Sequence, residues 1–346
     1  MDESRLTLLR RKLAQKILGN ISLTPLPPEL EPISPVHLAE IKRSFGMPKF
    51  FIFGYPRSGT TLLMRLVSLH PRVHCNREAH FFTRSIDATR IFSDKEIRQW
   101  LEKRSNRWTS GQALETPLLR LIADYIMERE ALRLGKEVVG DKTPNTNGGQ
   151  AVRRLKAVYP DARLIYIVRD GRDAALSHRF QHFIDHPEFL TRADRRIRLD
   201  FAKDSQPFLS QTRSVFSEKA IREEAISWSK NVTETHSLGQ ELFRECYLSL
   251  RYEDLLQEPF ICMQSIWSFL QVEQNFSHVA RMVEEKLNYN PGAEAQQKKE
   301  GSLALHIPRG KPGGWQELFT ARDKMIFKQY ASETLIDWNY EQDASW

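Results

Sequence analysis

Short apolar runs alternate with amphipathic segments along most of the chain. The run at 50–53 ends at Gly54 and predicts a buried strand, and similar runs predict strands at 138–140, 164–168 and 247–250. Helical spacing of apolar residues predicts helices at 60–69, 93–102, 117–134, 147–158, 172–183, 217–241, 259–270 and 320–336. Strands that alternate with helices predict an α/β fold with a central, mainly parallel sheet covered by helices on both faces.

The N-terminal 48 residues differ from the rest of the chain. Residues 4–19 carry Leu and Ile at helical spacing among basic residues, so they are expected to form an amphipathic helix. This helix either packs on the domain or a partner, or makes peripheral contact with an anionic membrane. The Pro-rich stretch up to Pro35 is expected to be an extended strap. We therefore divide the chain into 1–48 and a catalytic body at 49–346, in which 184–216 has no clear period and is interpreted as a substrate-side insertion.

Charge and cysteine content restrict the classes of partner. The net charge is +7, which favours an anionic ligand, but the basic residues of the body alternate with acidic ones and form no nucleic-acid stripe. The three cysteines are far apart, so neither a disulfide framework nor a metal site is expected. We find no apolar run long enough for a transmembrane helix and no apolar core of a signal peptide, and we expect a cytoplasmic protein.

The segment 54–61, Gly-Tyr-Pro-Arg-Ser-Gly-Thr-Thr, is the strongest chemical signal. It follows a predicted strand and opens a predicted helix, an arrangement in which loop amides and the helix N-terminus bind an anion. A P-loop phosphotransferase would have Lys where this chain has Thr60, and the basic residue here is Arg57 instead. The loop therefore suits one terminal phosphate with Arg57 beside the group bonded to it.

Three further segments carry candidate reactive side chains, two of them at predicted strand ends. Arg169 follows a strand, and Ser177 lies two helical turns later, so the two can converge on an anion. Glu78 and His80 are competing candidates for a general base that accepts the proton of a hydroxyl nucleophile, and Glu78 is preferred. Lys142 can neutralise charge that develops on a leaving oxygen.

The loop resembles the 5′-phosphosulfate loop of sulfotransferases that use 3′-phosphoadenosine 5′-phosphosulfate (PAPS), P-[KR]-[ST]-G-T-[ST]. Residues 56–61 match it in the Arg form of tyrosylprotein sulfotransferases. The resemblance implies a three-layer sulfotransferase fold with a P-loop-like anion site. It also implies that Arg57 contacts the sulfuryl group or the bridging oxygen, and the residues it assigns to the 5′-phosphate are Ser58, Gly59, Thr60 and Thr61.

The other segments resemble sulfotransferase motifs in the same order. The block Arg169 to Ser177 resembles the family's 3′-phosphate motif, which leaves Arg172 and Asp173 as local charges at a helix start. Residues 77–82 resemble the K-E-x-H-F-F block of heparan sulfotransferases, in which Glu is the base, whereas cytosolic sulfotransferases use His. Lys142 matches a K-[ST]-P block.

Two C-terminal segments extend the resemblance. Tyr252 lies in an R-Y-E-D-L segment and either reaches the adenine or packs at the sheet edge. Arg309 and Gly310 begin a block that resembles the R-K-G-x-x-G-x-W motif, which implies contact with the 3′-phosphate, although Lys311 is an alternative to Arg309.

Together these motifs imply a PAPS-dependent sulfotransferase that needs no metal ion and transfers the sulfuryl group to an acceptor hydroxyl by in-line displacement. The acceptor class is left open. The alternatives are a P-loop phosphotransferase and a catalytically inactive nucleotide-binding relative.

Overall fold

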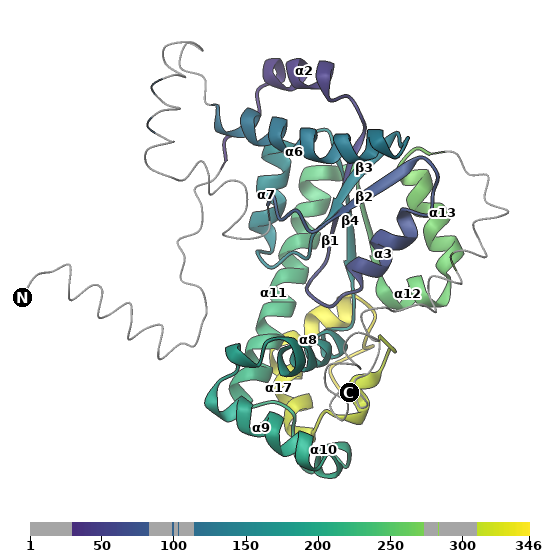
Figure 1. The fold of residues 1–346 in the computed structure, drawn as a ribbon. Coiled ribbons are helices and arrows are strands. Elements are labelled where there is room, and N and C mark those ends of the chain that lie inside the picture. Colours follow the sequence, from purple (N-terminus) through teal and green to yellow (C-terminus); the bar gives the residue numbers. More distant parts are fainter. Residues whose placement is uncertain (1–29, 83–98, 100–102, 104–113, 273–282, 284–309) are drawn as a thin grey trace, which may run out of the picture.

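A five-stranded parallel sheet forms the centre of the protein. The computed structural model describes residues 30–82, 114–272 and 310–346, with the single positions 99, 103 and 283 (Figure 1). The strand order is β2-β3-β1-β4-β5. The strands are β1 (Lys49–Phe53), β2 (Val73–Arg77), β3 (Val138–Lys142), β4 (Arg163–Val168) and β5 (Tyr247–Arg251). All four neighbouring pairs are parallel, so the predicted α/β class is confirmed.

Helices connect the strands and cover both faces of the sheet. The main helices are α2 (Pro35–Ser44), α3 (Thr60–Val67), α6 (Glu115–Arg133), α7 (Gly149–Val158), α8 (Gly171–Asp185), α11 (Glu218–Phe243), α12 (Tyr252–Gln257), α13 (Pro259–Phe269) and α17 (Ala321–Asp337). Those at α3, α6, α7, α8, α11, α13 and α17 lie where the apolar spacing predicts helices. The helix predicted at 93–102 lies outside the described residues. None of the helices in the described part of the chain combines the length and apolarity needed to cross a membrane.

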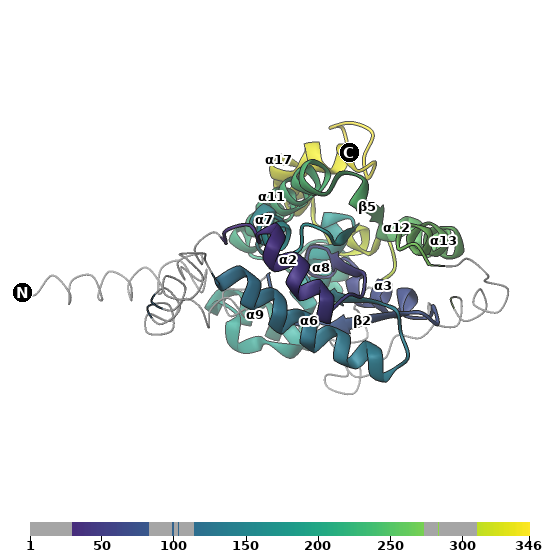
Figure 2. The same ribbon diagram turned by 90° about the horizontal axis from the view of Figure 1, so that it is seen from above.

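The alternation of side chains along β1 divides the core into two layers. Phe51 and Phe53 point to a large apolar cluster shared with α6, α7, α8, α11 and α17. Phe50 and Ile52 point to the opposite face and pack with residues of α3, α12 and α13. Figures 1 and 2 show α7 and α11 on one side of the sheet and α3, α12 and α13 on the other. Because every side chain of β1 is buried, the strand appears in the sequence as a continuous apolar run.

The sequence prediction missed one of the five strands, β2. Its residues alternate between buried and half-buried positions, since it lies at the sheet edge and pairs only with β3. Val73 and Cys75 are the buried apolar positions, and polar residues separate them. Such a short alternation among charged neighbours is too weak a signal to separate from a loop.

The Pro-rich stretch is not extended throughout, and our prediction is wrong at α2. Pro35 occupies the first turn of this helix, and the side chain of Ser34 caps it by accepting a hydrogen bond from the His37 amide. Proline is compatible with a first helical turn because its missing N–H has no intrahelical partner there. The predicted amphipathic helix at 4–19 lies outside the described residues.

Segment 184–216 contains helices that the sequence analysis did not predict. It forms η1 (Pro187–Phe189), α9 (Arg192–Lys203) and α10 (Gln206–Leu209). The aromatic rings of Phe201 and Phe180, on α9 and α8, lie 5.4 Å apart, and Arg179 of α8 pairs with the Asp194 carboxylate at 2.6 Å. Charged residues make up 7 of the 12 residues of α9, so they obscure its helical period in the sequence.

Candidate active site

The carboxyl ends of all five strands lie at one edge of the sheet, and each supplies one candidate side chain. The residues that follow or end β1 to β5 in turn are Arg57, Glu78, Lys142, Arg169 and Tyr252. The chain runs from β1 to β2 and β3 on one side, then crosses to β4 on the other. In parallel sheets such a reversal of strand order opens a crevice at the carboxyl edge, and ligands bind there.

The loop between β1 and α3 has the geometry of an anion site. Gly59 caps α3 in the left-handed conformation with φ of 86°, and a Cβ atom on it would lie 2.3 Å from the Tyr252 ring. Only glycine fits this position, because both the backbone angle and the close ring exclude a side chain. The Ser58 hydroxyl is fully buried and has no hydrogen-bond partner among the described residues. Since buried polar groups are normally paired, this hydroxyl fits a ligand oxygen.

Arg57, which lies in this loop, contacts Arg169 beside it. The Arg57 Nε donates to the Ser177 hydroxyl at 3.0 Å, and Arg169 donates to the Arg57 carbonyl oxygen at 3.2 Å. Burial lowers the pKa of the Arg57 guanidinium, and the positive charge of Arg169 lowers it further. Asp173 approaches Arg169 only to 4.0 Å, and the Arg169 Nε is buried without a partner in the described structure. Such a pair of cations is expected to bind an anion.

Tyr252 packs between the loop and the second arginine. Its ring centroid lies 4.9 Å from the Arg169 guanidinium, and its hydroxyl donates to the Gly310 carbonyl oxygen at 3.0 Å. Gly310 has a φ of 75°, so the turn that places it beside Tyr252 favours glycine. Arg309, which the family motif assigns to the 3′-phosphate, lies outside the described residues.

Glu78 and Lys142 form the centre of a second group. The Lys142 ammonium is 2.5 Å from a Glu78 carboxylate oxygen and donates to the Thr61 hydroxyl at 3.0 Å. The Lys142 side chain is fully buried, whereas Glu78 is about one third exposed. Partial burial opposes ionisation of Glu78, but the hydrogen bond and charge of Lys142 outweigh it and lower the pKa of the carboxyl group. Glu78 is therefore ionised near neutral pH and can accept a proton.

His80 lies beside Glu78. Its Nε2 is 3.9 Å from a Glu78 oxygen, and its side chain is partly exposed, unlike the neighbouring Phe81 and Phe82. Arg57, Glu78 and His80 all have positive φ, at 70°, 54° and 54°. Positive φ is uncommon outside glycine and concentrates at functional sites, where surrounding contacts must hold the strained backbone.

Asp141 and Thr143 hold this strained backbone, and the sequence analysis did not single them out. One Asp141 oxygen accepts from the Ala79 amide at 3.1 Å, and the other accepts from the Thr143 hydroxyl at 2.6 Å. The same hydroxyl accepts from the His80 amide at 3.3 Å. Burial raises the pKa of Asp141 to about 6 despite these bonds. Both residues flank Lys142 in the Gly-Asp-Lys-Thr-Pro segment, and this position was the only signal that could have identified them.

Arg172 and Asp173 lie in the first turn of α8, as predicted, but both also make distant contacts. Asp173 accepts from the Gly313 and Trp315 amides at 2.8 and 2.9 Å, which fastens the C-terminal segment to α8. The Arg172 guanidinium lies 3.9 Å from the Trp315 ring and 4.5 Å from the Trp346 ring. Arg172 also pairs with Asp170 at 2.7 Å within the helix start, whereas the contacts with the C-terminal segment join residues more than 100 positions apart, which local spacing could not reveal.

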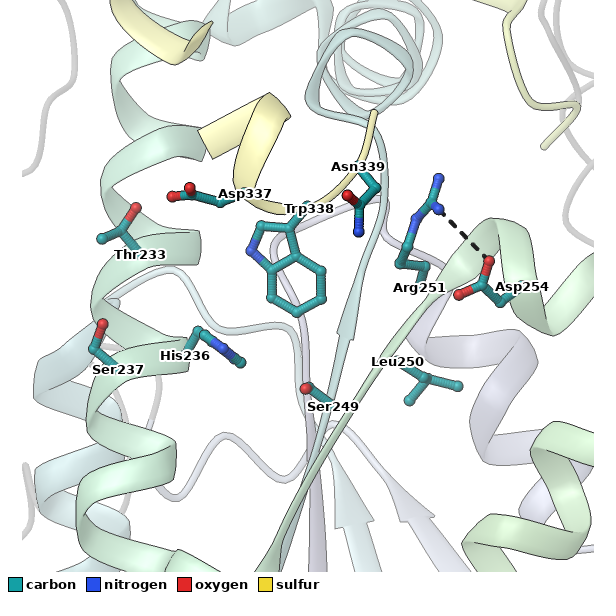
Figure 3. Close-up of a pocket in the computed structure, with 10 residues that line it drawn as sticks. All are labelled: Thr233, His236, Ser237, Ser249, Leu250, Arg251, Asp254, Asp337, Trp338 and Asn339. Carbon is teal, nitrogen blue, oxygen red and sulfur yellow. Dashed lines mark ion pairs between the residues drawn. The ribbon is translucent and has the colours of Figure 1, made fainter. Parts of the chain in front are cut away.

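A separate cleft of about 480 Å³ lies along the outer edge of β5 (Figure 3). Its walls include His236 and Trp338, whose rings are 4.9 Å apart, and the ion pair of Arg251 with Asp254. None of the candidate catalytic or nucleotide-binding residues lines it, and it is distinct from the site at the strand ends.

Known proteins similar to this chain include sulfotransferases. A sulfotransferase family model matches residues 48–276. Protein-tyrosine sulfotransferase 2 of Gallus gallus is 25% identical over 234 residues, covering 67% of this chain and 53% of that protein. The protein-tyrosine sulfotransferase of Drosophila melanogaster is 26% identical over 232 residues, covering 66% of this chain and 39% of that protein.

The chain thus spans about half or less of the length of these relatives. Among solved structures, a mouse sulfotransferase complexed with adenosine 3′,5′-bisphosphate (PAP) aligns with a TM-score of 0.46 at 16% identity, covering 90% of this chain and 96% of that one. The family match extends over most of the chain and includes the anion loop, the Glu78–Lys142 pair, Arg169 and Tyr252. The protein therefore belongs to the sulfotransferase family.

Proposed function

We propose that the protein transfers a sulfuryl group from PAPS to an acceptor hydroxyl at the carboxyl edge of the sheet. The observation that carries this proposal is the presence of two anion-binding groups beside one acid–base pair. The loop with Ser58 and Gly59 suits the 5′-phosphate, and Arg169 with Ser177 suits the 3′-phosphate. The unpaired Ser58 hydroxyl and Arg169 Nε are the atoms that such phosphates would satisfy.

In this scheme the residues divide the work of an in-line displacement. The acceptor oxygen forms a bond to sulfur while the bond between sulfur and the bridging oxygen breaks, and adenosine 3′,5′-bisphosphate (PAP) leaves. Glu78 accepts the acceptor proton. Arg57 and Lys142 stabilise the negative charge that moves onto the bridging oxygen, and neither step requires a metal ion.

The ligand preference of the protein tests this assignment against the P-loop phosphotransferase. PAP is expected to raise the Tm of the protein more than ATP with magnesium, because two separated sites suit two phosphates and Thr60 stands where the NTPase Lys would be. A ligand at a hundredfold excess over its Kd stabilises the folded state by about 2.7 kcal/mol. Equal or greater stabilisation by ATP with magnesium would favour the phosphotransferase.

A second experiment tests the inactive relative. Cell extract is incubated with protein and PAPS, and mass spectrometry detects products heavier by one sulfuryl group. No such product is expected from an inactive relative.

A second prediction separates 3′-phosphate recognition from catalysis. Arg169→Ala is expected to weaken PAP binding by about 1.5–3 kcal/mol, because it removes a charge-assisted contact. The loss should disappear for adenosine 5′-phosphosulfate, which lacks the 3′-phosphate. Calorimetry measures both affinities. Arg163→Ala, at the opposite end of β4, is the control. If Arg169→Ala keeps the wild-type preference for the 3′-phosphorylated nucleotide, this assignment of Arg169 is wrong.

A further inference from the structure

The backbone that carries Glu78 is fastened to the end of β3 by three successive amides. The acceptors are the Lys142 carbonyl oxygen for the Glu78 amide at 2.7 Å, an Asp141 carboxylate oxygen for the Ala79 amide at 3.1 Å, and the Thr143 hydroxyl for the His80 amide at 3.3 Å. The first is a main-chain bond that prolongs the pairing of β2 with β3. The other two acceptors are side-chain atoms, so these bonds depend on which residues stand at 141 and 143.

Asp141 and Lys142 hold the segment from opposite faces of the sheet, because successive residues of a strand point to opposite faces. Lys142 donates to the Thr61 hydroxyl on α3 at 3.0 Å and pairs with the Glu78 carboxylate. Asp141 is in register with Phe51 of β1, which belongs to the other layer of the core. One face of β3 therefore binds the Glu78 side chain, and the other binds the backbone that follows it.

The Asp141 carboxylate completes this arrangement only while it is ionised. It accepts from both the Ala79 amide and the Thr143 hydroxyl, which donates at 2.6 Å. While the Thr143 hydroxyl donates its proton to Asp141, its oxygen can accept from the His80 amide. Protonation would give Asp141 a hydroxyl of its own and leave one proton of this buried pair without an acceptor in the chain of bonds.

The segment needs these bonds because its backbone is strained. Glu78 and His80 both have a φ of 54°, a value that residues other than glycine rarely adopt. Such a conformation persists only where surrounding contacts hold it. Loss of the bonds to Asp141 and Thr143 is therefore expected to let the segment relax and to move the Glu78 carboxylate.

We propose that Asp141 is a positioning residue for the base, which fixes Glu78 through the Ala79 amide and the Thr143 hydroxyl. It acts through the backbone of the segment, and Glu78 remains the proton acceptor. This inference rests on the proposed function and adds to it a second carboxylate whose ionisation the reaction requires.

This positioning depends on pH. Burial raises the pKa of Asp141 to about 6, and the charge of Glu78 contributes to the rise, whereas that of Lys142 opposes it. Burial also opposes ionisation of Glu78, but Lys142 lowers the pKa of that carboxyl group. The thiol of Cys75, which also interacts with Asp141, stays neutral because burial raises its pKa. As the pH falls through about 6, Asp141 therefore takes up a proton before Glu78 does.

Substitutions that keep the side-chain shape test the inference in the full chain. Asp141→Asn is expected to lower kcat by about 10²-fold at unchanged PAP affinity, because asparagine offers one acceptor oxygen to two donors and a displaced catalytic group has an effect of this size. Thr143→Val should lower kcat similarly, and Thr143→Ser, which keeps the hydroxyl, should retain the wild-type value. Turnover of an acceptor that the wild type sulfates and calorimetry with PAP measure the two quantities.

Two further readouts separate positioning from a general loss of structure. The acidic side of the pH–kcat/KM profile should show two steps in the wild type, an upper one near pH 6 from Asp141 and a lower one from Glu78. Asp141→Asn should lack the upper step because asparagine does not titrate. Hydrogen exchange at residues 79–80, followed by mass spectrometry without turnover, should be faster in Asp141→Asn than in the wild type.

Asp323→Asn is the matched control. Asp323 is fully buried at the start of α17 and accepts from the Thr320 hydroxyl at 2.8 Å and from the Thr320 amide at 3.1 Å. The control thus loses bonds of the same kinds from a residue that is not among those of the proposed site. It should lower the Tm of the protein but leave kcat, both pH steps and exchange at residues 79–80 unchanged.

The inference is overturned if Asp141→Asn keeps wild-type turnover, if its upper pH step persists, or if Thr143→Ser loses as much activity as Thr143→Val. Wild-type protein that neither binds PAP nor sulfates an acceptor rejects the proposed function and this inference together. Wild-type turnover that survives Asp141→Asn rejects the inference alone.

Discussion

Replacing Glu78 with glutamine is expected to lower kcat by about 10²–10⁴-fold while the affinity for PAP stays near that of wild type. Glutamine keeps the shape of the side chain and can still contact Lys142, but it cannot take a proton. The carboxylate lies 2.5 Å from the Lys142 ammonium and is only partly buried. The substitution removes the charged partner of Lys142, but the glutamine amide oxygen can still accept its hydrogen bond. Turnover of an acceptor that the wild type sulfates and calorimetry with PAP measure the two quantities separately.

Two other variants decide whether the effect belongs to Glu78. Glu137→Gln removes an exposed carboxylate that pairs with Arg72 outside the site and should leave turnover unchanged. His80→Asn should lower kcat less than Glu78→Gln does, because its ring is 3.9 Å from the Glu78 carboxylate and lies outside the Lys142 contact. If Glu78→Gln keeps most of its turnover while His80→Asn abolishes it, His80 is the base.

Lys142→Met is expected to lower kcat by about 10²–10³-fold, the usual cost of removing one group that stabilises charge in the transition state. Methionine fills most of the fully buried volume of the lysine side chain, so the strand should remain packed. The Glu78 carboxyl loses the partner that lowers its pKa, so its pKa should rise. The acidic limb of the pH–kcat/KM profile should then move to higher pH, because a larger fraction of Glu78 is protonated at a given pH.

The direction of this shift gives the lysine variant a readout that a structural defect would not produce. Lys136→Met is the control. Lys136 precedes β3 at the end of the strand opposite Lys142, and its ammonium donates to the Pro71 carbonyl oxygen. This substitution should change neither kcat nor the pH profile. In the double variant with Glu78→Gln, the two losses should be less than additive because the side chains act as a pair. A full multiplicative loss, or an unchanged acidic limb in Lys142→Met, would contradict the role proposed for the pair.

The lowered pKa of Glu78 is compatible with its role as a base. A carboxylate paired with Lys142 is a weak proton acceptor, but the acceptor hydroxyl becomes more acidic as its oxygen bonds to sulfur. In the proposed scheme, Lys142 also interacts with the charge that develops on the bridging oxygen, and this would weaken its hold on Glu78. Proton acceptance and charge stabilisation would then support each other at the same stage of the reaction.

The sequence alone determined most of the sheet and the candidate catalytic residues. A central strand such as β1 is buried on both faces, so its residues form an apolar run, and the loop after it has glycine where a side chain would strike Tyr252. Residues directly after parallel strands share one edge of the sheet. For this reason, Arg57, Lys142 and Arg169, which follow predicted strands, could be expected at a single site, whereas Glu78 was assigned through its resemblance to a family motif.

Elements stabilised by distant contacts were decided only by the tertiary structure. The edge strand β2 and the charged segment at α9 carry too few apolar residues to show a period, and partners elsewhere in the fold hold them. Asp173 appears in the sequence as an ordinary polar residue of a helix. Its role depends on the amides at Gly313 and Trp315. Local spacing encodes which face of an element is apolar, but it cannot encode which remote group meets a polar side chain, because packing of the whole chain brings those groups together.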